Sequence, residues 1–354
     1  MTAFAIPLRR AEPWKVVPMD ESPRSRTLFV LGGGGALGAY QAGALRALIE
    51  AGIIPDALFG ASVGGLNAAF LASDPGPRRA GQLVRWWLNE QTHDVLTPSL
   101  WNRVRGVTAA AVGAANALFD ERPLRRLITT HVRAHDISEL AVPLTVTTTC
   151  LDCGRAEHHT RGRTGDVLVA SCALPGLFPA TRLADGHRHV DGGVLHGVPI
   201  EPAIANAHSD DQIFVLDCGL APVTAREGSC AAAPIAGLPT EACGLVPAPG
   251  RGRYEPPVEL YRGVFQTVLD SFTVSRAAAN RSAVAPYVDD PRVHVVPHVA
   301  DAWAAGLLDR LPAGPRDTSA VSQLLGAGYV ATRTWLAAVT PRNGVHRSRE
   351  DGLA

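Results

Sequence analysis

The chain has 354 residues, of which 46% are hydrophobic, so it can form one large domain or two small domains with a substantial core. Its 33 basic and 33 acidic residues give a formal net charge of zero, which excludes attraction to nucleic acid or anionic membranes by net charge alone. Lys15 is the only lysine, and this bias toward arginine, with abundant Ala, Gly and Pro, is typical of a bacterial genome of high GC content.

Predicted strands and helices alternate along the chain. The short apolar runs that predict buried strands are at 27–31, 56–62, 143–149, 212–218 and 292–298. The stretches with helical spacing of apolar residues are at 36–51, 63–73, 78–90, 120–132, 165–174, 257–283 and 319–339. This alternation predicts an α/β fold in which a mainly parallel sheet is layered with helices.

The domain boundaries follow from composition. We expect one domain over residues 27–340, preceded by a flexible segment at 1–26 and followed by a flexible tail at 341–354. Residues 219–256 are rich in Ala, Pro and Gly without clear periodicity, which predicts a long loop or insertion within that domain.

Neither a signal peptide nor a membrane span is expected. The first 26 residues lack the continuous apolar core of a signal peptide. Two long uncharged runs, Leu28–Leu45 and Ala57–Ser73, approach membrane-spanning length, but each has a sharp glycine-rich point and contains Gln41 or Asn67. We interpret each run as a strand, a turn and a helix in a buried core, and expect a cytoplasmic protein.

A run of four glycines follows the first predicted strand. Within it, Gly33-x-Gly35-x-x-Gly38 has the spacing of a dinucleotide-binding fingerprint. That fingerprint requires an acidic residue at the end of the second strand to hold the ribose. Asp56 has nearly the right distance in sequence, but it begins the second strand and the end is occupied by Ser62. A nucleotide-binding oxidoreductase is therefore the weaker alternative.

The strongest local signal is Gly60-Ala-Ser62-Val-Gly64, which lies between a predicted strand and a predicted helix. A sharp turn in that setting exposes the serine Oγ, and the helix N-terminus supplies N–H groups and positive potential for a developing oxyanion. The motif favours an esterase-like nucleophile at Ser62. The alternative is a tight turn with a capping serine.

A nucleophilic serine needs a base, and two kinds of residue are available. Asp191-Gly192-Gly193 offers a carboxylate beside two glycines that let the backbone pass close to the serine, although this tripeptide is also a common turn. A histidine is the alternative base, and the candidates in the chain are His187, His189, His196, His294 and His298.

The glycine-rich loop, the G-x-S-x-G elbow and the later D-G-G occur in an order that resembles the patatin-like phospholipases, a family of serine lipid acyl hydrolases. The resemblance covers roughly residues 27–335, and three further stretches fit it: "FDERPLRRLI" (119–128), "ASCALPGLFPA" (170–180) and "LLGAGYVATRTWL" (324–336).

The resemblance implies a three-layer α/β/α fold and a catalytic dyad of Ser62 and Asp191 without histidine. The implied oxyanion hole uses backbone N–H groups of Gly33, Gly34 and Gly35. The remaining glycines of the three motifs, which would support them, are Gly38, Gly60, Gly64, Gly192 and Gly193. The implied cycle is attack on an ester carbonyl, an acyl-serine intermediate and hydrolysis by water that the aspartate activates.

One residue departs from the family. Many members have the pattern G-G-G-x-[RK]-G, whereas this chain has Leu37 at the basic position. Leucine cannot pair with a phosphate, so a neutral-lipid or short-ester esterase of the same fold is an alternative to a phospholipase. A non-catalytic scaffold that kept the fold is a more remote one, because both dyad residues are present.

The expected partners are a lipid ester and, transiently, a membrane or lipid aggregate, with no nucleic acid. Candidate contact surfaces are Trp86-Trp87, the loop around Trp101 and residues 174–180, each with core packing as its alternative. The chemistry requires neither a cofactor nor a metal. Cys150 and Cys153 have C-x-x-C spacing, but no second pair completes a zinc site, so we predict packing, with a metal or redox role as the alternative.

Overall fold

The computed structural model describes residues 25–89, 117–218, 264–297 and 319–339. Most of the predicted N-terminal segment, together with the predicted insertion at 219–256 and tail at 341–354, lies outside the described residues. Trp101 and His298 also lie outside them.

The described ranges contain an eight-stranded, mostly parallel sheet that organises the domain. Its strands are β1 (Thr27–Leu31), β2 (Ala57–Ala61), β3 (Leu144–Cys150), β4 (Arg155–His159), β5 (Thr181–Arg182), β6 (Arg188–Asp191), β7 (Gln212–Leu216) and β8 (Val293–Val295). The order is β5-β6-β3-β2-β1-β7-β8, with β4 paired to β3. The path from β3 to β8 is parallel, whereas β4 and β6 run antiparallel to β3. The predicted α/β class and mainly parallel sheet are confirmed.

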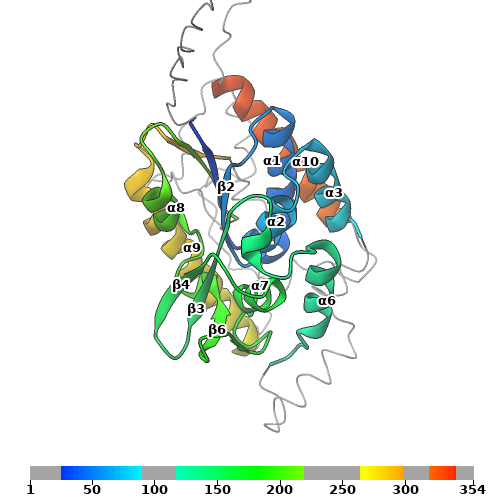
Figure 1. Ribbon diagram of the computed structural model, residues 1–354, viewed down its shortest axis with the longest axis vertical. Coiled ribbons are helices and arrows are strands. Elements are labelled where there is room, and N and C mark those ends of the chain that lie inside the picture. The colour runs from blue at the N-terminus through cyan, green and yellow to red at the C-terminus, as the bar shows by residue number, and fades with distance from the viewer. Residues whose placement is uncertain (1–24, 90–116, 219–263, 298–318, 340–354) are drawn as a thin grey trace, which may run out of the picture.

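Helices cover both faces of this sheet (Figure 1). One side carries α1 (Gly38–Glu50), α2 (Val63–Ala72), α3 (Pro77–Trp87), α6 (Arg122–His131), α7 (Thr164–Ser171) and α10 (Ser319–Val339). The other side carries α8 (Ile200–Asn206) and α9 (Val264–Val284). Alternate residues of β1 serve the two sides: Phe29 and Leu31 join the first cluster, and Leu28 and Val30 join the second. A strand buried on both faces explains why β1 is apolar throughout.

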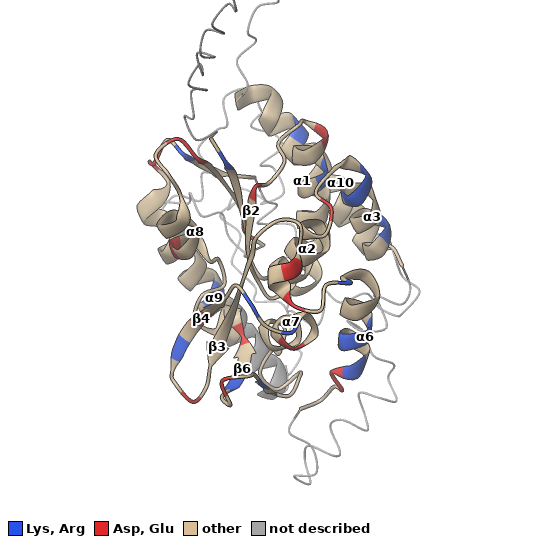
Figure 2. Cartoon of the chain, viewed as in Figure 1, with Lys and Arg blue, Asp and Glu red and all other residues tan. Residues whose placement is uncertain are grey.

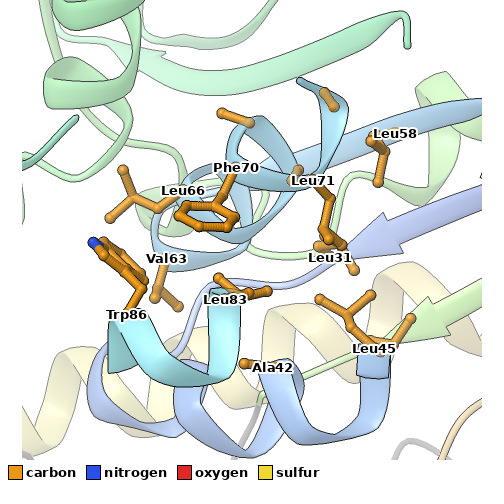
Figure 3. Close-up of a cluster of buried hydrophobic side chains, with 14 of the residues drawn as sticks. Leu31, Ala42, Leu45, Leu58, Val63, Leu66, Phe70, Leu71, Leu83 and Trp86 are labelled. Atoms are coloured by element: carbon orange, nitrogen blue, oxygen red, sulfur yellow. The ribbon is translucent and has the colours of Figure 1, made fainter. Parts of the chain in front are cut away.

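Packing in the first layer buries the two neighbouring tryptophans. Figure 3 shows Trp86 and Leu83 of α3 beside Val63, Leu66 and Phe70 of α2. Trp86 and Trp87 are only 7% and 1% exposed, so their alternative interpretation as core residues is correct and they are not a membrane-contact surface. No helix within the described ranges is both long and apolar enough to cross a membrane.

Candidate active site

Ser62 lies at the sharp turn between β2 and α2. Its backbone angles are φ 54° and ψ −129°, and it is the only non-glycine residue with positive φ in the described part of the chain. Such a conformation is strained for an L-residue and persists only where the surroundings enforce it. Ser62 is the N-cap of α2, next to the free N–H groups of the first helical turn, and it is 7% exposed. This is the geometry that the G-x-S-x-G motif predicts.

The sheet itself brings Asp191 to this turn. Ala61, the last residue of β2, pairs with Thr147, and Asp191, the last residue of β6, pairs with the next residue, Thr148. β4 pairs with both threonines along one edge of β3. The other edge of β3 is therefore shared by β2 and β6, and the ends of these two strands meet there. The Ser62 hydroxyl donates a hydrogen bond to Asp191 Oδ2 at 2.6 Å.

Residues at the C-terminal end of α7 position both Ser62 and Asp191. Ser171 Oγ accepts the backbone N–H of Ser62 at 2.9 Å and donates to the Thr147 carbonyl at 2.7 Å. The Ala173 carbonyl accepts the backbone N–H of Asp191 at 3.0 Å. The stretch 170–180 therefore contributes backbone and hydroxyl contacts that position the pair, a role that the sequence motif did not specify.

The Asp191 carboxylate is buried and fully oriented. It is 3% exposed, and its Oδ1 accepts the Gly193 N–H at 2.7 Å while Oδ2 faces Ser62. Burial raises the pKa of Asp191 above the usual carboxyl value, and the hydrogen bonds from Ser62 and Gly193 and the charge of Arg276 offset part of that rise. A higher pKa makes this carboxylate a stronger base toward the serine hydroxyl than an exposed aspartate.

The glycine-rich loop passes directly over Ser62. A Cβ on Gly33 would lie 2.9 Å from the Ser62 Cβ, and a Cβ on Gly34 would lie 2.2 Å from that of Cys218. Gly35 has φ +56°, a left-handed conformation that favours glycine. The Gly33 N–H donates to the Gly197 carbonyl at 2.9 Å, whereas Gly34 and Gly35 lie at the start of the 3₁₀ turn Gly35–Leu37, where N–H groups lack intrahelical partners.

A buried amide network anchors this loop from behind. Gln41 Nε2 donates to the carbonyls of Gly32 at 3.1 Å and Leu216 at 2.9 Å. Asn67 Nδ2 donates to Gln41 Oε1 at 2.8 Å, and the Trp87 indole N–H donates to Asn67 Oδ1 at 3.0 Å. Gln41 and Asn67 interrupt the two long apolar runs of the sequence, and their place in the fold gives the reason. Their amide groups pair with each other and donate to buried backbone carbonyls of the loop and of β7.

The other motif glycines lie where chain segments approach too closely for a side chain. A Cβ on Gly64 would meet the Leu31 carbonyl at 2.1 Å, and one on Gly192 would meet the Thr147 carbonyl at 2.5 Å. Similar contacts within 3.0 Å arise at Gly38, Gly60 and Gly193. These glycines let the elbow, the glycine-rich loop and β6 converge on one point.

Two further residues close to Ser62 and Asp191 were not predicted from the sequence. Arg276 of α9 is 8% exposed, and its Cδ would lie 3.0 Å from a Cβ on Gly193. Its charge lowers the pKa of both Asp191 and Cys218, so the guanidinium lies within electrostatic reach of the carboxylate and of the glycine-rich loop. The thiol of Cys172 is also in the site: burial raises its pKa, and the charge of Asp191 raises it further.

The candidate histidines have other described partners. His189 Nε2 lies 2.9 Å from Asp185 Oδ2, and His187 Nδ1 lies 3.1 Å from Cys153 Sγ. His196 Nδ1 lies 3.5 Å from Glu201 Oε2. His294 is in β8, three strands away from β2, and contacts Gln212 Oε1 at 2.6 Å.

Asp56 lies at the wrong edge of the sheet for a ribose ligand. Its Oδ2 accepts the N–H of Thr27 at 2.8 Å, at the start of β1. Because β1 and β2 are parallel, this places the carboxylate at the opposite end of the strands from the glycine-rich loop and Ser62.

A cavity of about 860 Å³ lies elsewhere, at the far end of α2 from Ser62. Its lining includes Phe70 together with Arg79 and Arg85 of α3 and Arg133, which follows α6. Figure 2 shows the basic residues of α3 and α6 on this side of the molecule. A ten-residue helix is about 15 Å long, so this cavity is separate from the serine turn.

A family profile matches the part of the chain that contains Ser62 and Asp191. The profile of the family described as patatin-like phospholipase matches residues 29–204, the segment that contains the glycine-rich loop, Ser62 and Asp191. The chain carries a patatin-like phospholipase domain. The match supports the fold and the order of motifs expected from the sequence.

Among curated relatives, patatin-like phospholipase domain-containing protein 6 of Mus musculus is 31% identical over 192 residues. Neuropathy target esterase sws of Drosophila sechellia is 31% identical over 172 residues, and lysophospholipase NTE1 of Mycosarcoma maydis is 29% identical over 192 residues. These matches cover 54%, 48% and 54% of this chain, but only 13%, 11% and 10% of the respective relatives. The likeness therefore concerns the patatin-like domain and not the whole of those proteins.

Among solved structures, VipD from Legionella pneumophila aligns with a TM-score of 0.44 and 14% sequence identity. The alignment covers 89% of this chain and 67% of that one. This likeness is too weak to support a comparison of the sites.

Proposed function

We propose that this protein is a lipid acyl hydrolase that cleaves carboxylic esters of phospholipids or related lipids through Ser62 and Asp191. The observation that carries the proposal is the 2.6 Å hydrogen bond from a strained elbow serine to a buried carboxylate. The patatin-like phospholipase profile and the lysophospholipase among the relatives support a lipid ester as the substrate class.

In the proposed cycle, Asp191 Oδ2 takes the hydroxyl proton as Ser62 Oγ attacks the ester carbonyl. The tetrahedral oxyanion accepts N–H donors from Gly34 and Gly35, near the positive end of α2. Because the Gly33 N–H already donates to Gly197, its proposed contribution is the close approach to Ser62. Collapse of the oxyanion expels the alcohol, which takes a proton from Asp191 and leaves an acyl-serine. Asp191 then removes a proton from water as the water oxygen attacks the acyl carbon. The bond from that carbon to Ser62 Oγ breaks, Asp191 returns the proton to Oγ, and the fatty acid is released.

Leu37 does not by itself argue against a phospholipid substrate. Its side chain is packed in the core beneath the loop, so this position does not face a ligand. We propose that Arg276 of α9 supplies the positive charge that many family members place in the loop. Its Nε is buried without a hydrogen-bond partner among the described residues, and its charge acts on both Asp191 and Cys218. A lipid phosphate is an anion that such a guanidinium would bind.

A labelling experiment tests the hydrolase assignment. Wild-type protein should react covalently with a fluorophosphonate probe at Ser62 and release fatty acid from lysophospholipids or phospholipids, whereas Ser62→Ala should do neither. A panel that adds acylglycerols and short p-nitrophenyl esters separates a phospholipase from a neutral esterase. Folded wild-type protein that stays unlabelled with and without detergent or lipid would contradict the proposal, and NADH binding would favour the oxidoreductase.

Replacing Arg276 tests the headgroup proposal. Arg276→Met should lower kcat/KM for an anionic phospholipid by about 10- to 100-fold, the worth of a hydrogen bond to a charged group, and should affect a p-nitrophenyl ester less. It should also shift the acid limb of the pH–rate profile upward, because Arg276 lowers the pKa of Asp191. Arg281→Met, on the same helix, is the matched control. Equal losses on both substrates would remove Arg276 from headgroup binding.

A further inference from the structure

Two hairpin turns at one end of the sheet bring three metal-ligating side chains together. Cys150 ends β3, Cys153 lies in the turn before β4, and His187 immediately precedes β6. Because β3 pairs with both β4 and β6, the two turns are neighbours, and Leu151 N–H donates to the Arg188 carbonyl at 2.8 Å. The two Sγ atoms and one imidazole nitrogen all lie within 4.8 Å of one another, and His187 Nδ1 is 3.1 Å from Cys153 Sγ.

The first turn is shaped to aim both sulfurs at one point. The backbone N–H of Cys153 donates to Cys150 Sγ at 3.0 Å, which holds the two cysteines of this turn close together. Gly154, with φ +67°, then redirects the chain into β4. The C-x-x-C pair, for which we predicted packing with a metal or redox role as the alternative, is therefore folded with both sulfurs close to an imidazole nitrogen of His187.

A second set of contacts fixes the two turns to each other. Asp152, between the two cysteines, forms an ion pair with Arg188 at 2.6 Å and accepts the backbone N–H of Arg188 at 2.7 Å. Asp185 accepts the backbone N–H of His187 at 2.9 Å. The backbone of both turns that carry the metal-ligating side chains is thus fixed before any metal ion binds. Such supporting contacts orient the ligands of metal sites.

We propose that Cys150, Cys153 and His187 form a zinc-binding site that joins the β3–β4 turn to the β5–β6 turn. Two thiolates and an imidazole suit Zn²⁺, whereas Mg²⁺ and Ca²⁺ prefer oxygen ligands. Ligand atoms around tetrahedral zinc lie about 3.8 Å apart, given Zn–S bonds near 2.3 Å, so these three atoms need only small shifts. Binding releases the two thiol protons, and water supplies the fourth ligand on the side where His187 is exposed.

The proposed ion acts on the fold of the active-site edge and takes no part in ester cleavage. His187 is four residues before Asp191, and Cys150 pairs with His189 of the same strand. A metal between the turns therefore fastens β6, whose last residue is the carboxylate partner of Ser62. This inference is independent of the proposed hydrolase function, because the site is read out by metal binding.

Metal binding by the full-length, reduced protein tests the site. After purification with a phosphine reductant, wild-type protein should bind one equivalent of Zn²⁺. Zinc binding should raise the Tm of the protein by a few degrees. Co²⁺ bound in place of Zn²⁺ should give thiolate charge-transfer and tetrahedral d–d absorption. Cys153→Ser and His187→Ala should each weaken zinc binding by about 100-fold or more. Both side chains lie at a solvent-accessible turn, so the variants should fold, as circular dichroism can verify.

Matched controls separate this site from other ligands in the chain. His135→Ala, at an exposed histidine with no part in the cluster, should bind zinc like wild type. Glu157, His159 and His189 form a second group of possible ligands, so His159→Ala serves as a competing test. Loss of zinc in His159→Ala with retention in Cys153→Ser would overturn the assignment. Absence of cobalt–thiolate absorption in reduced wild-type protein would overturn it as well.

Discussion

Asp191→Asn is expected to reduce ester hydrolysis by about 10³-fold while making the folded protein more stable at neutral pH. A general base contributes typically 10²- to 10⁴-fold to the rate, and asparagine cannot accept the serine proton. Asparagine is nearly isosteric, and its side-chain oxygen can still accept the Gly193 N–H that Asp191 Oδ1 accepts in the wild type. Activity and stability should therefore change in opposite directions, which loss of folding cannot produce.

The sign of the stability change follows from the pKa of Asp191. Burial raises that pKa in the folded state, so the native protein holds this proton more tightly than the unfolded chain does. The contribution of Asp191 to the free energy of unfolding is fully present below the pKa of about 3.9 that it has in the unfolded chain. This contribution decreases as the pH rises through the pKa of Asp191 in the folded protein. Catalysis requires the ionised form, so wild-type activity should rise over the same interval.

Urea unfolding of both proteins at a series of pH values measures the effect. The stability advantage of Asp191→Asn should grow as the pH rises through the folded pKa and then level off. Asp211→Asn is a control of opposite sign. Burial alone would raise the pKa of Asp211, but hydrogen bonds from Arg26 and from the His208 N–H lower it to about 2. That variant should be destabilised at neutral pH. A near-wild-type rate for Asp191→Asn, with loss of activity in His189→Ala or His196→Ala, would assign the base to histidine.

The sequence was most informative where structure is local. The elbow at Ser62 was predictable because a buried strand, small flanking residues and an immediate helix are encoded within a few positions. The helix predicted at 319–339 agrees with α10, and the helix predicted at 36–51 corresponds to α1, which Gly52, with φ +85°, follows closely. Apolar periodicity is strong in these segments, and few alternative conformations satisfy it.

Elements with little apolar signal were missed. β4, with the sequence RAEHH, and β6, with RHVD, contain too many charged residues and histidines for a strand pattern. They form because the edge of β3 offers paired backbone groups, a tertiary effect that local sequence does not encode. The predicted meeting of Ser62 and Asp191 thus depended on the family resemblance, since the strand that carries Asp191 was not recognised.

Long-range contacts account for the remaining gaps. The charge of Arg276 acts on Asp191 from α9, although the two residues are 85 positions apart in sequence. No sequence motif contains Arg276. His187 and Cys153 are separated by 34 positions, so the C-x-x-C spacing alone did not indicate that this histidine would lie beside the two cysteines. Both groupings arise from sheet topology, which decides which distant turns become neighbours.

Ser62→Gly is expected to be more stable than Ser62→Ala by about 1–2 kcal/mol, although both should lose fluorophosphonate labelling and hydrolysis. Neither variant has the Oγ nucleophile or its hydrogen bond to Asp191, so these losses cancel in the comparison. What differs is the Cβ at φ 54° and ψ −129°, a conformation that glycine adopts without strain and alanine does not. Urea unfolding of the two variants measures this strain directly. Ser73, with φ −70°, is the control position, because there alanine should be the more stable by up to about 1 kcal/mol. The same order of stability at both positions would mean that the elbow of the folded protein does not hold Ser62 in a strained backbone conformation.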